Sequence, residues 1–197
     1  MNTPNKLTLL RVVLVPIFVM FLVFDVGASA FEWERIAALV LFIGASITDF
    51  ADGHIARKYG LVTNFGKFLD PLADKFLVLG ALISLCLIAE NDIYGKLLLL
   101  ATAIVVFREL AVTSMRLVVV GASGVVVAAN IYGKIKTVSQ ICFICLAIAS
   151  PLFAFNEILY FIFVALQYVF MTLMTLMTII SGVIYIKGYW KYIDPTK

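Results

Sequence analysis

A segment near the carboxyl end of the chain, residues 158–186, carries no charged side chain. A helix needs about 20 consecutive apolar residues to cross the hydrocarbon core of a bilayer, so this segment favours a transmembrane helix. The rest of the chain has the same character, because 63% of its residues are hydrophobic and only 14% are charged. These proportions differ from those of soluble and disordered proteins. The sequence therefore predicts an all-α integral membrane protein with six transmembrane helices in a single domain, residues 1–197.

The expected chain order is an interfacial helix followed by six spans with short connections. Polar and glycine-containing stretches separate the apolar segments, and Pro16 falls in the first turns of the first span, where proline is tolerated. The expected segments are an interfacial helix at 2–11 and spans at about 12–30, 36–58, 70–89, 97–120, 137–155 and 158–186.

The basic residues predict the orientation of these spans. Most of them fall at one face, only Arg35 and Lys96 fall at the other, and Arg108 lies inside a span. Cytoplasmic loops carry the excess of Lys and Arg, so both termini are expected inside. The net charge of +3 is small and gives no indication of nucleic-acid binding. The residues at the basic face are Lys6, Arg11, Arg57, Lys58, Lys67, Lys75, Arg116, Lys134, Lys136, Lys187, Lys191 and Lys197.

The stretch from Thr48 to Lys75 is the most highly charged part of the chain. A carboxylate at the centre of a membrane helix costs roughly 2.5–3.5 kcal/mol, so four of them would cost on the order of 10 kcal/mol without compensation. The four carboxylates belong to Asp49, Asp52, Asp70 and Asp74. Helical geometry separates the first two by about 60° and the last two by about 40°, so each pair shares one face.

A divalent cation can compensate this charge. The ends of two antiparallel neighbouring helices bring the four carboxylates to one depth, and a site with only oxygen ligands favours Mg²⁺, Mn²⁺ or Ca²⁺ over zinc. Beside them, Arg57 can bind a phosphate through two hydrogen bonds. Small residues at Gly53, Ala56 and Gly66 leave space for a ligand.

Three other interpretations of these charged residues compete with a catalytic metal site. Paired Asp and Lys or Arg residues near helix ends often form only interfacial ion pairs. A cation transporter is a second alternative, although it would be expected to place acidic residues or broken helices near the bilayer midplane, often in repeated halves. A purely structural membrane protein is the third.

The spacing of the charged stretch resembles a known family motif. It reads Asp49-x-x-Asp52-Gly53-x-x-Ala56-Arg57, eight residues, then Gly66-x-x-x-Asp70-x-x-x-Asp74, and it is similar to the motif of the CDP-alcohol phosphotransferases at every fixed position. His54 fills a variable position of that motif. The resemblance implies a six-helix fold with a cavity that faces the cytoplasm, a homodimer, and a place in the cytoplasmic membrane of a bacterium.

The resemblance also implies roles for the motif residues. The four Asp would hold one or two Mg²⁺ or Mn²⁺ ions, and Asp74 would also act as the general base. The CDP-diacylglycerol site would comprise Asp52, Gly53, Ala56, Arg57, Gly66, Asn5 and Thr8.

Other stretches narrow the resemblance to bacterial members that use glycerol 3-phosphate as the acceptor. They are Asn5 to Arg11, Val62 to Lys75, Arg108 to Arg116, and Gly133 to Thr137. Such an acceptor carries its own phosphate and needs a second cationic site. Another acceptor, namely phosphatidylglycerol, serine or an inositol phosphate, is the alternative within the family. The candidates for binding glycerol 3-phosphate are Arg108, Arg116, Lys134 and Lys136. The alternative for the lysines is that they only mark the cytoplasmic interface, and the alternative for Arg108 is a pairing with Glu109 or with the helix backbone.

Overall fold

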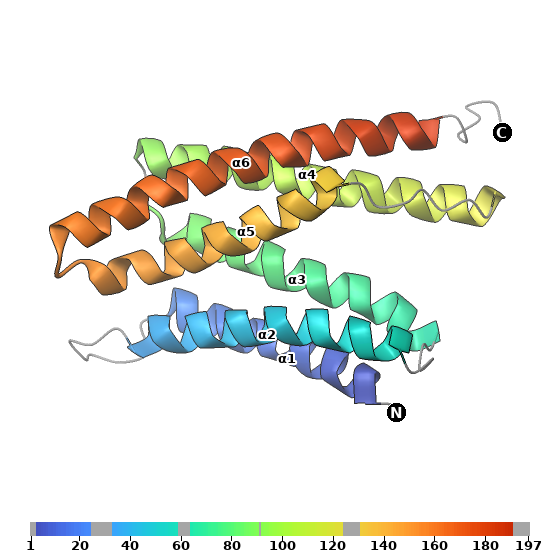
Figure 1. Cartoon of the computed structure of the whole chain (residues 1–197), viewed down its shortest axis with the longest axis horizontal. Helices are drawn as coiled ribbons and strands as arrows, with labels where there is room; N and C mark the ends of the chain where they lie inside the picture. The colour runs from blue at the N-terminus through green and yellow to red at the C-terminus, as the bar shows by residue number, and fades with distance from the viewer. Residues whose placement is uncertain (1–2, 25–32, 59–63, 91, 124–130, 191–197) are drawn as a thin grey trace. The chain divides into compact units, whose positions relative to one another are not determined.

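The computed structural model describes residues 3–24, 33–58, 64–90, 92–123 and 131–190 (Figure 1). Within these ranges the side chains of 3–7, 49–71, 74 and 120–123 are not described. The described residues form helices and no strand, in agreement with the predicted all-α fold. The helices are α1 (Thr3–Val23), α2 (Trp33–Lys58), α3 (Asn64–Ile88), α4 (Ile93–Ser123), α5 (Ile131–Ala149), the short 3₁₀ helix η1 (Ser150–Phe153) and α6 (Glu157–Trp190).

Three helical segments among the described residues are long and apolar enough to cross a membrane. They are Ile93–Val119, Ile131–Phe153 and Glu157–Trp190, and two shorter apolar helices are Thr8–Val23 and Lys75–Ile88. The chain is therefore a helical membrane protein with several candidate spans, and the total of six spans stays a prediction.

Side-chain caps explain where two of the long helices begin. The Oδ1 atom of Asp92 accepts a hydrogen bond of 2.8 Å from the backbone N–H of Gly95 at the start of α4. The Oδ1 atom of Asn156 accepts one of 3.1 Å from the N–H of Leu159 at the start of α6. Each cap satisfies a donor that the first helical turn leaves without a backbone partner.

Several helix bounds differ from those expected from hydropathy. Helix α1 runs without a break through the expected boundary between 11 and 12, which puts Pro16 in its interior and not in its first turns. Helix α3 begins at Asn64, before the expected start at 70. Charged residues such as Lys67 are good helix formers, so a helix continues beyond the apolar stretch that marks a span. Helix α5 gives way to η1 at Pro151, because proline cannot donate the hydrogen bond that would continue the α-helix.

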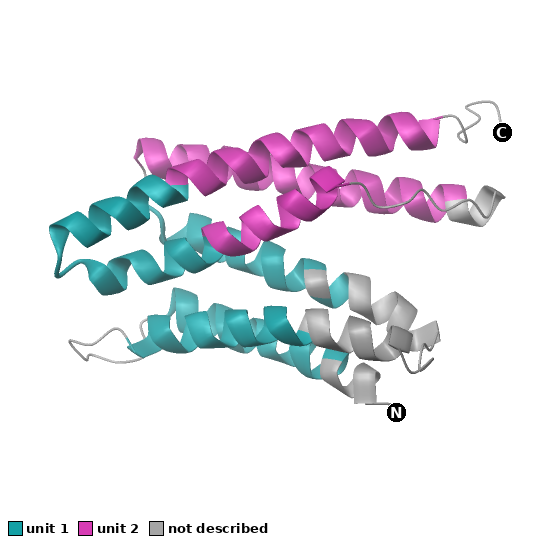
Figure 2. Ribbon diagram, viewed as in Figure 1, with its two compact units in different colours: residues 1–90, 144–167 teal, residues 91–143, 168–197 magenta. Residues whose placement is uncertain are grey.

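The chain divides into two compact units (Figure 2). Unit 1 comprises Met1–Glu90 and Ile144–Gln167, and unit 2 comprises Asn91–Phe143 and Tyr168–Lys197. Helices α5 and α6 each contribute one part to unit 1 and the other part to unit 2.

In unit 1, α1 packs against both α2 and α3. The rings of Phe18 on α1 and Phe42 on α2 are buried, with their centroids 5.7 Å apart. A Cβ atom added at Gly80 of α3 would lie 3.4 Å from Val15 and 3.6 Å from Val19, so α1 and α3 approach closely there. Small residues favour such close packing of helices in membranes, where the hydrophobic effect does not drive helices together.

In unit 2, α6 packs against α4 through an aromatic cluster. The rings of Tyr185 and Tyr189 are buried and stacked, with their centroids 6.2 Å apart. They pack with Val112 and Val119 of α4, and Met115 lies against the same cluster.

Candidate functional site

The two halves of the carboxylate motif lie on consecutive helices of unit 1. Helix α2 carries Asp49 and Asp52, and α3 carries Asp70 and Asp74, so all four acidic residues are helical as the spacing requires. The side chains of these four residues, and of Asn5, Gly53, Ala56, Arg57 and Gly66, lie outside the described part of the structure. Their convergence on a metal ion stays a prediction.

The chemistry of this donor set fits a hard divalent cation, because carboxylate oxygens are the ligands that Mg²⁺ and Mn²⁺ prefer. Among the residues whose side chains are described, no group of three or more His, Cys, Asp or Glu residues is placed to hold a metal. The motif on α2 and α3 is therefore the candidate metal site that the sequence and the helices support.

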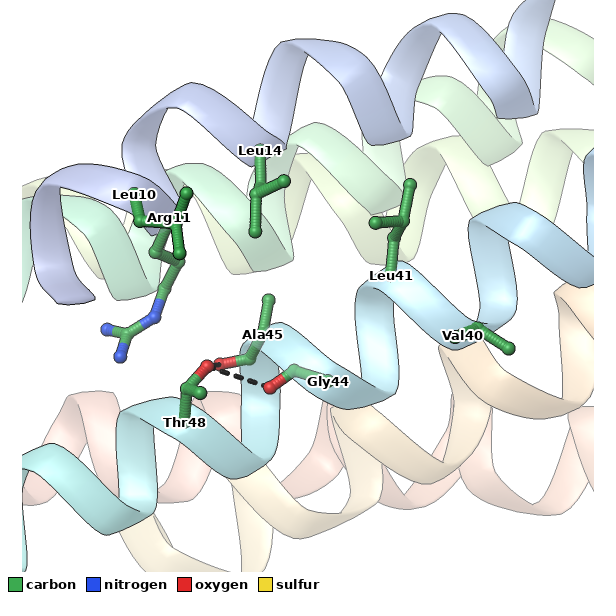
Figure 3. A pocket seen from close by; sticks show the side chains of 8 residues that line it. All are labelled: Leu10, Arg11, Leu14, Val40, Leu41, Gly44, Ala45 and Thr48. Carbon is green, nitrogen blue, oxygen red and sulfur yellow. Dashed lines mark hydrogen bonds between the residues drawn. The ribbon is translucent and has the colours of Figure 1, made fainter.

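A cleft lies between α1 and α2, next to the beginning of the motif (Figure 3). It has a volume of about 200 Å³. Arg11 and Thr48 lie at one end of the cleft, and Val40 and Leu41 lie at the other. Thr48 directly precedes Asp49 in the sequence. The lining residues are Leu10, Arg11, Leu14, Val40, Leu41, Gly44, Ala45 and Thr48.

Two polar residues of α1 are almost completely buried near this end. Thr8, predicted to bind CDP-diacylglycerol, and Arg11 are each only 1% exposed. An Arg side chain buried to this degree in an apolar protein is costly unless it meets anionic or polar partners. Arg11 was not among the predicted site residues.

In unit 2, Glu109 joins two of the predicted acceptor-binding cations. Its Oε1 atom accepts a hydrogen bond of 2.8 Å from the guanidinium of Arg108, its neighbour on α4. The same oxygen accepts a hydrogen bond from Nζ of Lys136 on α5. Two positive charges on different helices therefore share one carboxylate, and the three groups carry a net charge of +1.

Helix α6 fixes the other side of Arg108. The guanidinium carbon lies 5.5 Å from the centre of the Tyr185 ring, within the range of a cation–π interaction. A Cβ atom added at Gly182 would lie only 3.0 Å from Cγ of Arg108. The Nε atom of Arg108 is buried and has no hydrogen-bond acceptor among the described residues.

The other two predicted acceptor-binding residues have different surroundings. Arg116 and Lys134 are both exposed, whereas Lys136 is buried and Arg108 is largely so. The structure thus brings together two of the four predicted cations, through a carboxylate. Sequence reasoning named Glu109 only as an alternative partner of Arg108, and it missed Gly182 and Tyr185. Only Glu109 gave a signal there, as an acidic neighbour of Arg108 inside a span.

Comparison with known proteins places the chain among lipid-synthesising membrane enzymes. Residues 1–180 match the model of a family described as CDP-alcohol phosphatidyltransferase. The chain is 47% identical over 147 residues to the CDP-diacylglycerol–glycerol-3-phosphate 3-phosphatidyltransferase of Bacillus subtilis, which covers 71% of this chain and 72% of the relative.

Two further relatives match over most of both chains. One is a probable phosphatidylglycerophosphate synthase of Mycobacterium tuberculosis, 37% identical over 188 residues, or 94% of this chain and 80% of the relative. The other is a CDP-diacylglycerol–glycerol-3-phosphate 3-phosphatidyltransferase of Rickettsia bellii, 36% identical over 193 residues and 97% of each chain.

Proposed function

The chain belongs to the CDP-alcohol phosphatidyltransferase family, and from this membership we propose that it transfers the phosphatidyl group of CDP-diacylglycerol to glycerol 3-phosphate. The products are phosphatidylglycerophosphate and CMP. The observation that carries the proposal is the 47% identity to a relative named for this reaction. A cation transporter and a purely structural role, the alternatives from other classes, are not supported by this membership.

The donor and the metal are assigned to unit 1. Asp49, Asp52, Asp70 and Asp74 would hold one or two Mg²⁺ or Mn²⁺ ions. A bound divalent ion would neutralise the diphosphate and stabilise the departing CMP. The remaining donor contacts are assigned to Asn5, Thr8, Asp52, Gly53, Ala56, Arg57 and Gly66.

The acceptor phosphate is assigned to Arg108 and Lys136 of unit 2. The net charge of +1 on the cluster with Glu109 supports this assignment, as does the unpartnered Nε donor of Arg108. A phosphate offers both cations oxygen acceptors and supplies the remaining countercharge. The exposed Arg116 and Lys134 are retained as secondary contacts.

The reaction is a substitution at phosphorus. A hydroxyl oxygen of glycerol 3-phosphate bonds to the phosphorus of the phosphatidyl group, and the bond from that phosphorus to the CMP oxygen breaks. CMP leaves with the bonding electron pair. Asp74 accepts the proton of the attacking hydroxyl, a role that requires its carboxylate to lie within hydrogen-bond reach of the hydroxyl.

We further propose a homodimer in the cytoplasmic membrane with both termini and the active site facing the cytoplasm. The distribution of basic residues supports the orientation. The homodimer rests on the resemblance to the family.

The test uses purified protein in detergent with CDP-diacylglycerol and glycerol 3-phosphate. CMP release and the lipid product are followed with Mg²⁺, with Mn²⁺ and with EDTA. We expect turnover with either metal and none with EDTA. Turnover with serine, phosphatidylglycerol or an inositol phosphate, and none with glycerol 3-phosphate, would overturn the acceptor assignment.

Asp74→Asn should lower turnover by at least about 100-fold, the scale of general-base catalysis, with an unchanged melting temperature. Near-normal turnover of this variant would exclude Asp74 as the base.

A further inference from the structure

Helix α5 carries two buried polar side chains one turn apart, those of Lys136 and Gln140. They are 6% and 2% exposed. Residues four apart on a helix lie on the same face, with their Cβ atoms about 5–6 Å apart. Gln140 therefore shares the buried face of Lys136, one turn further along α5. Both residues belong to unit 2, which also contains the ion pair of Arg108 and Glu109.

The amide of Gln140 differs in its hydrogen bonding from the hydroxyl groups beside it on α5. The hydroxyl of Thr137 donates to the carbonyl oxygen of Gly133 at 3.2 Å. The hydroxyl of Ser139 donates to the carbonyl oxygen of Ile135 at 2.8 Å, so both are satisfied on their own helix. The buried Nε2 atom of Gln140 has no acceptor in the described part of the chain. A buried amide without a partner is costly, so a bound ligand is a candidate to meet it.

A second glutamine shows how a structural amide is satisfied in this protein. Gln167 of α6 is 4% exposed, and its Nε2 atom donates a hydrogen bond of 3.4 Å to the carbonyl oxygen of Leu146 on α5. Both residues belong to unit 1. A side chain that bonds across helices in this way helps to hold a membrane bundle together. Among the described residues Gln140 makes no such bond, so the structural explanation that suits Gln167 does not suit Gln140.

The chemistry of this amide matches a hydroxyl group. A side-chain amide is neutral and both donates and accepts hydrogen bonds, as a hydroxyl does. An ionised phosphate offers only acceptors and favours cations such as Arg108 and Lys136. Glycerol 3-phosphate has one hydroxyl on its central carbon, next to the carbon that bears the phosphate, and one on its far terminal carbon. A phosphate held by Lys136 would put the central hydroxyl within the reach of a side chain one helical turn away.

We propose that Gln140 binds the central hydroxyl of glycerol 3-phosphate and makes the chain selective for acceptors that carry this group. The inference rests on the proposed function, because it extends the acceptor site assigned to Arg108 and Lys136. The terminal hydroxyl is less hindered and is the one that attacks phosphorus. Gln140 is therefore a binding and specificity residue with no part in the proton transfer. A site built around a hydroxyl rejects an analogue without it, because the amide is then left unpaired.

The first experiment compares two acceptors on the wild-type chain. They are glycerol 3-phosphate and 3-hydroxypropyl phosphate, which lacks only the central hydroxyl, each with CDP-diacylglycerol and Mg²⁺ or Mn²⁺ in detergent. We expect kcat/KM to be about tenfold higher for glycerol 3-phosphate, the scale of one hydrogen bond whose loss leaves a buried amide unpaired. Equal values for the two acceptors would overturn the inference and leave the proposed function standing. No product from either acceptor would overturn both.

The second experiment removes the amide. Gln140→Met keeps an unbranched side chain of similar size and similar helix propensity. We expect kcat/KM for glycerol 3-phosphate to fall about tenfold and that for 3-hydroxypropyl phosphate to change less than about twofold, so that the preference disappears. The melting temperature should equal or exceed that of wild type, because the substitution removes a buried amide that has no acceptor among the described residues.

Gln167→Met is the matched control, since it makes the same substitution at an amide that bonds to Leu146. This variant should keep the tenfold preference for glycerol 3-phosphate, whatever its melting temperature. A preference that survives in Gln140→Met, or an equal loss with both acceptors, would overturn the inference. Failure of Gln140→Met to fold would also overturn it, because the amide would then be needed for stability.

Discussion

At the scale of single residues, Glu109 has the clearest role that the motif did not predict. Its carboxylate is largely buried and bonds both Arg108 and Lys136, which come from different helices. Two cations brought together in an apolar protein repel each other, and a shared carboxylate reduces that repulsion. Glu109 is therefore expected to be a positioning residue for the acceptor phosphate, through the two cations that it holds.

This role gives a prediction for Glu109→Gln, which removes the charge and keeps the size. We expect the KM for glycerol 3-phosphate to rise about tenfold, equivalent to about 1.4 kcal/mol, with little change in the KM for CDP-diacylglycerol. The measurement is steady-state kinetics with each substrate varied in turn, beside a thermal melt of the same sample. If Glu109 instead competed with the phosphate for the cations, its removal would lower this KM, and a value at or below wild type would refute the role.

A double-mutant cycle with Lys136→Gln separates positioning from general damage. Because Glu109 acts partly through Lys136 and partly through Arg108, the effects of the two substitutions on the KM for glycerol 3-phosphate should be less than additive. The double variant leaves one cation, Arg108, without its carboxylate, whereas Glu109→Gln leaves two, so the double variant should lose less stability than Glu109→Gln. Fully additive effects on the KM would show that the two residues act independently.

At the scale of helices, substitution by alanine is expected to have opposite effects on stability at two glycines, Gly80 and Gly182. Alanine is favoured over glycine in a helix by about 1 kcal/mol. A Cβ at Gly80 would stand 3.4 Å from Val15, an ordinary contact, whereas one at Gly182 would stand 3.0 Å from Cγ of Arg108. Arg108 cannot move easily, because Glu109 and Tyr185 hold its guanidinium.

We therefore expect Gly80→Ala to keep or raise the melting temperature and to leave both KM values unchanged. Gly182→Ala should cost about 1–3 kcal/mol through overpacking, partly offset by helix propensity, and should raise the KM for glycerol 3-phosphate several-fold. Thermal unfolding in detergent and acceptor kinetics on both variants check these expectations. Equal behaviour of the two variants would mean that α6 does not position Arg108.

The helices also show how far the sequence could predict the fold. Apolar stretches gave the all-α class and the order of the elements. They did not give the true start of α3, because hydropathy marks the apolar stretch and not the first helical turn, which contains Lys67. Pro151 illustrates a second limit: its effect, a change from α5 to a 3₁₀ turn, depends on backbone hydrogen bonds that a span assignment ignores.

The candidate site could likewise be predicted from the sequence only in part. The motif could be located from spacing alone, since residues three and four apart share a helix face. The bond between Glu109 and Lys136 could not, because it joins positions on α4 and α5 whose proximity only the packing of the helices sets. The contact between Gly182 and Arg108 is equally long-range, and no local pattern indicated it.

At the scale of the whole molecule, the distribution of basic residues makes a prediction about orientation in the membrane. If the basic face is cytoplasmic, the turn between η1 and α6 must lie outside, as must the segment before α2. Asn156 marks that turn and is exposed, so Asn156→Cys gives a probe at the outer face. Thr196→Cys gives a probe near the carboxyl end.

Both probes are placed in a variant whose three natural cysteines, Cys86, Cys142 and Cys145, are replaced by alanine. A membrane-impermeant maleimide added to intact cells, or to spheroplasts if the cells have an outer membrane, should label position 156 and leave position 196 unlabelled. After lysis it should label both, and each variant should retain turnover as evidence of a native fold. The reverse pattern would place the termini, and with them the ends of α2 and α3 that carry the carboxylate motif, on the outside. Glycerol 3-phosphate is a charged, soluble acceptor, so an active site on the outside could not take it up from the cytoplasm, and the proposed orientation would be wrong.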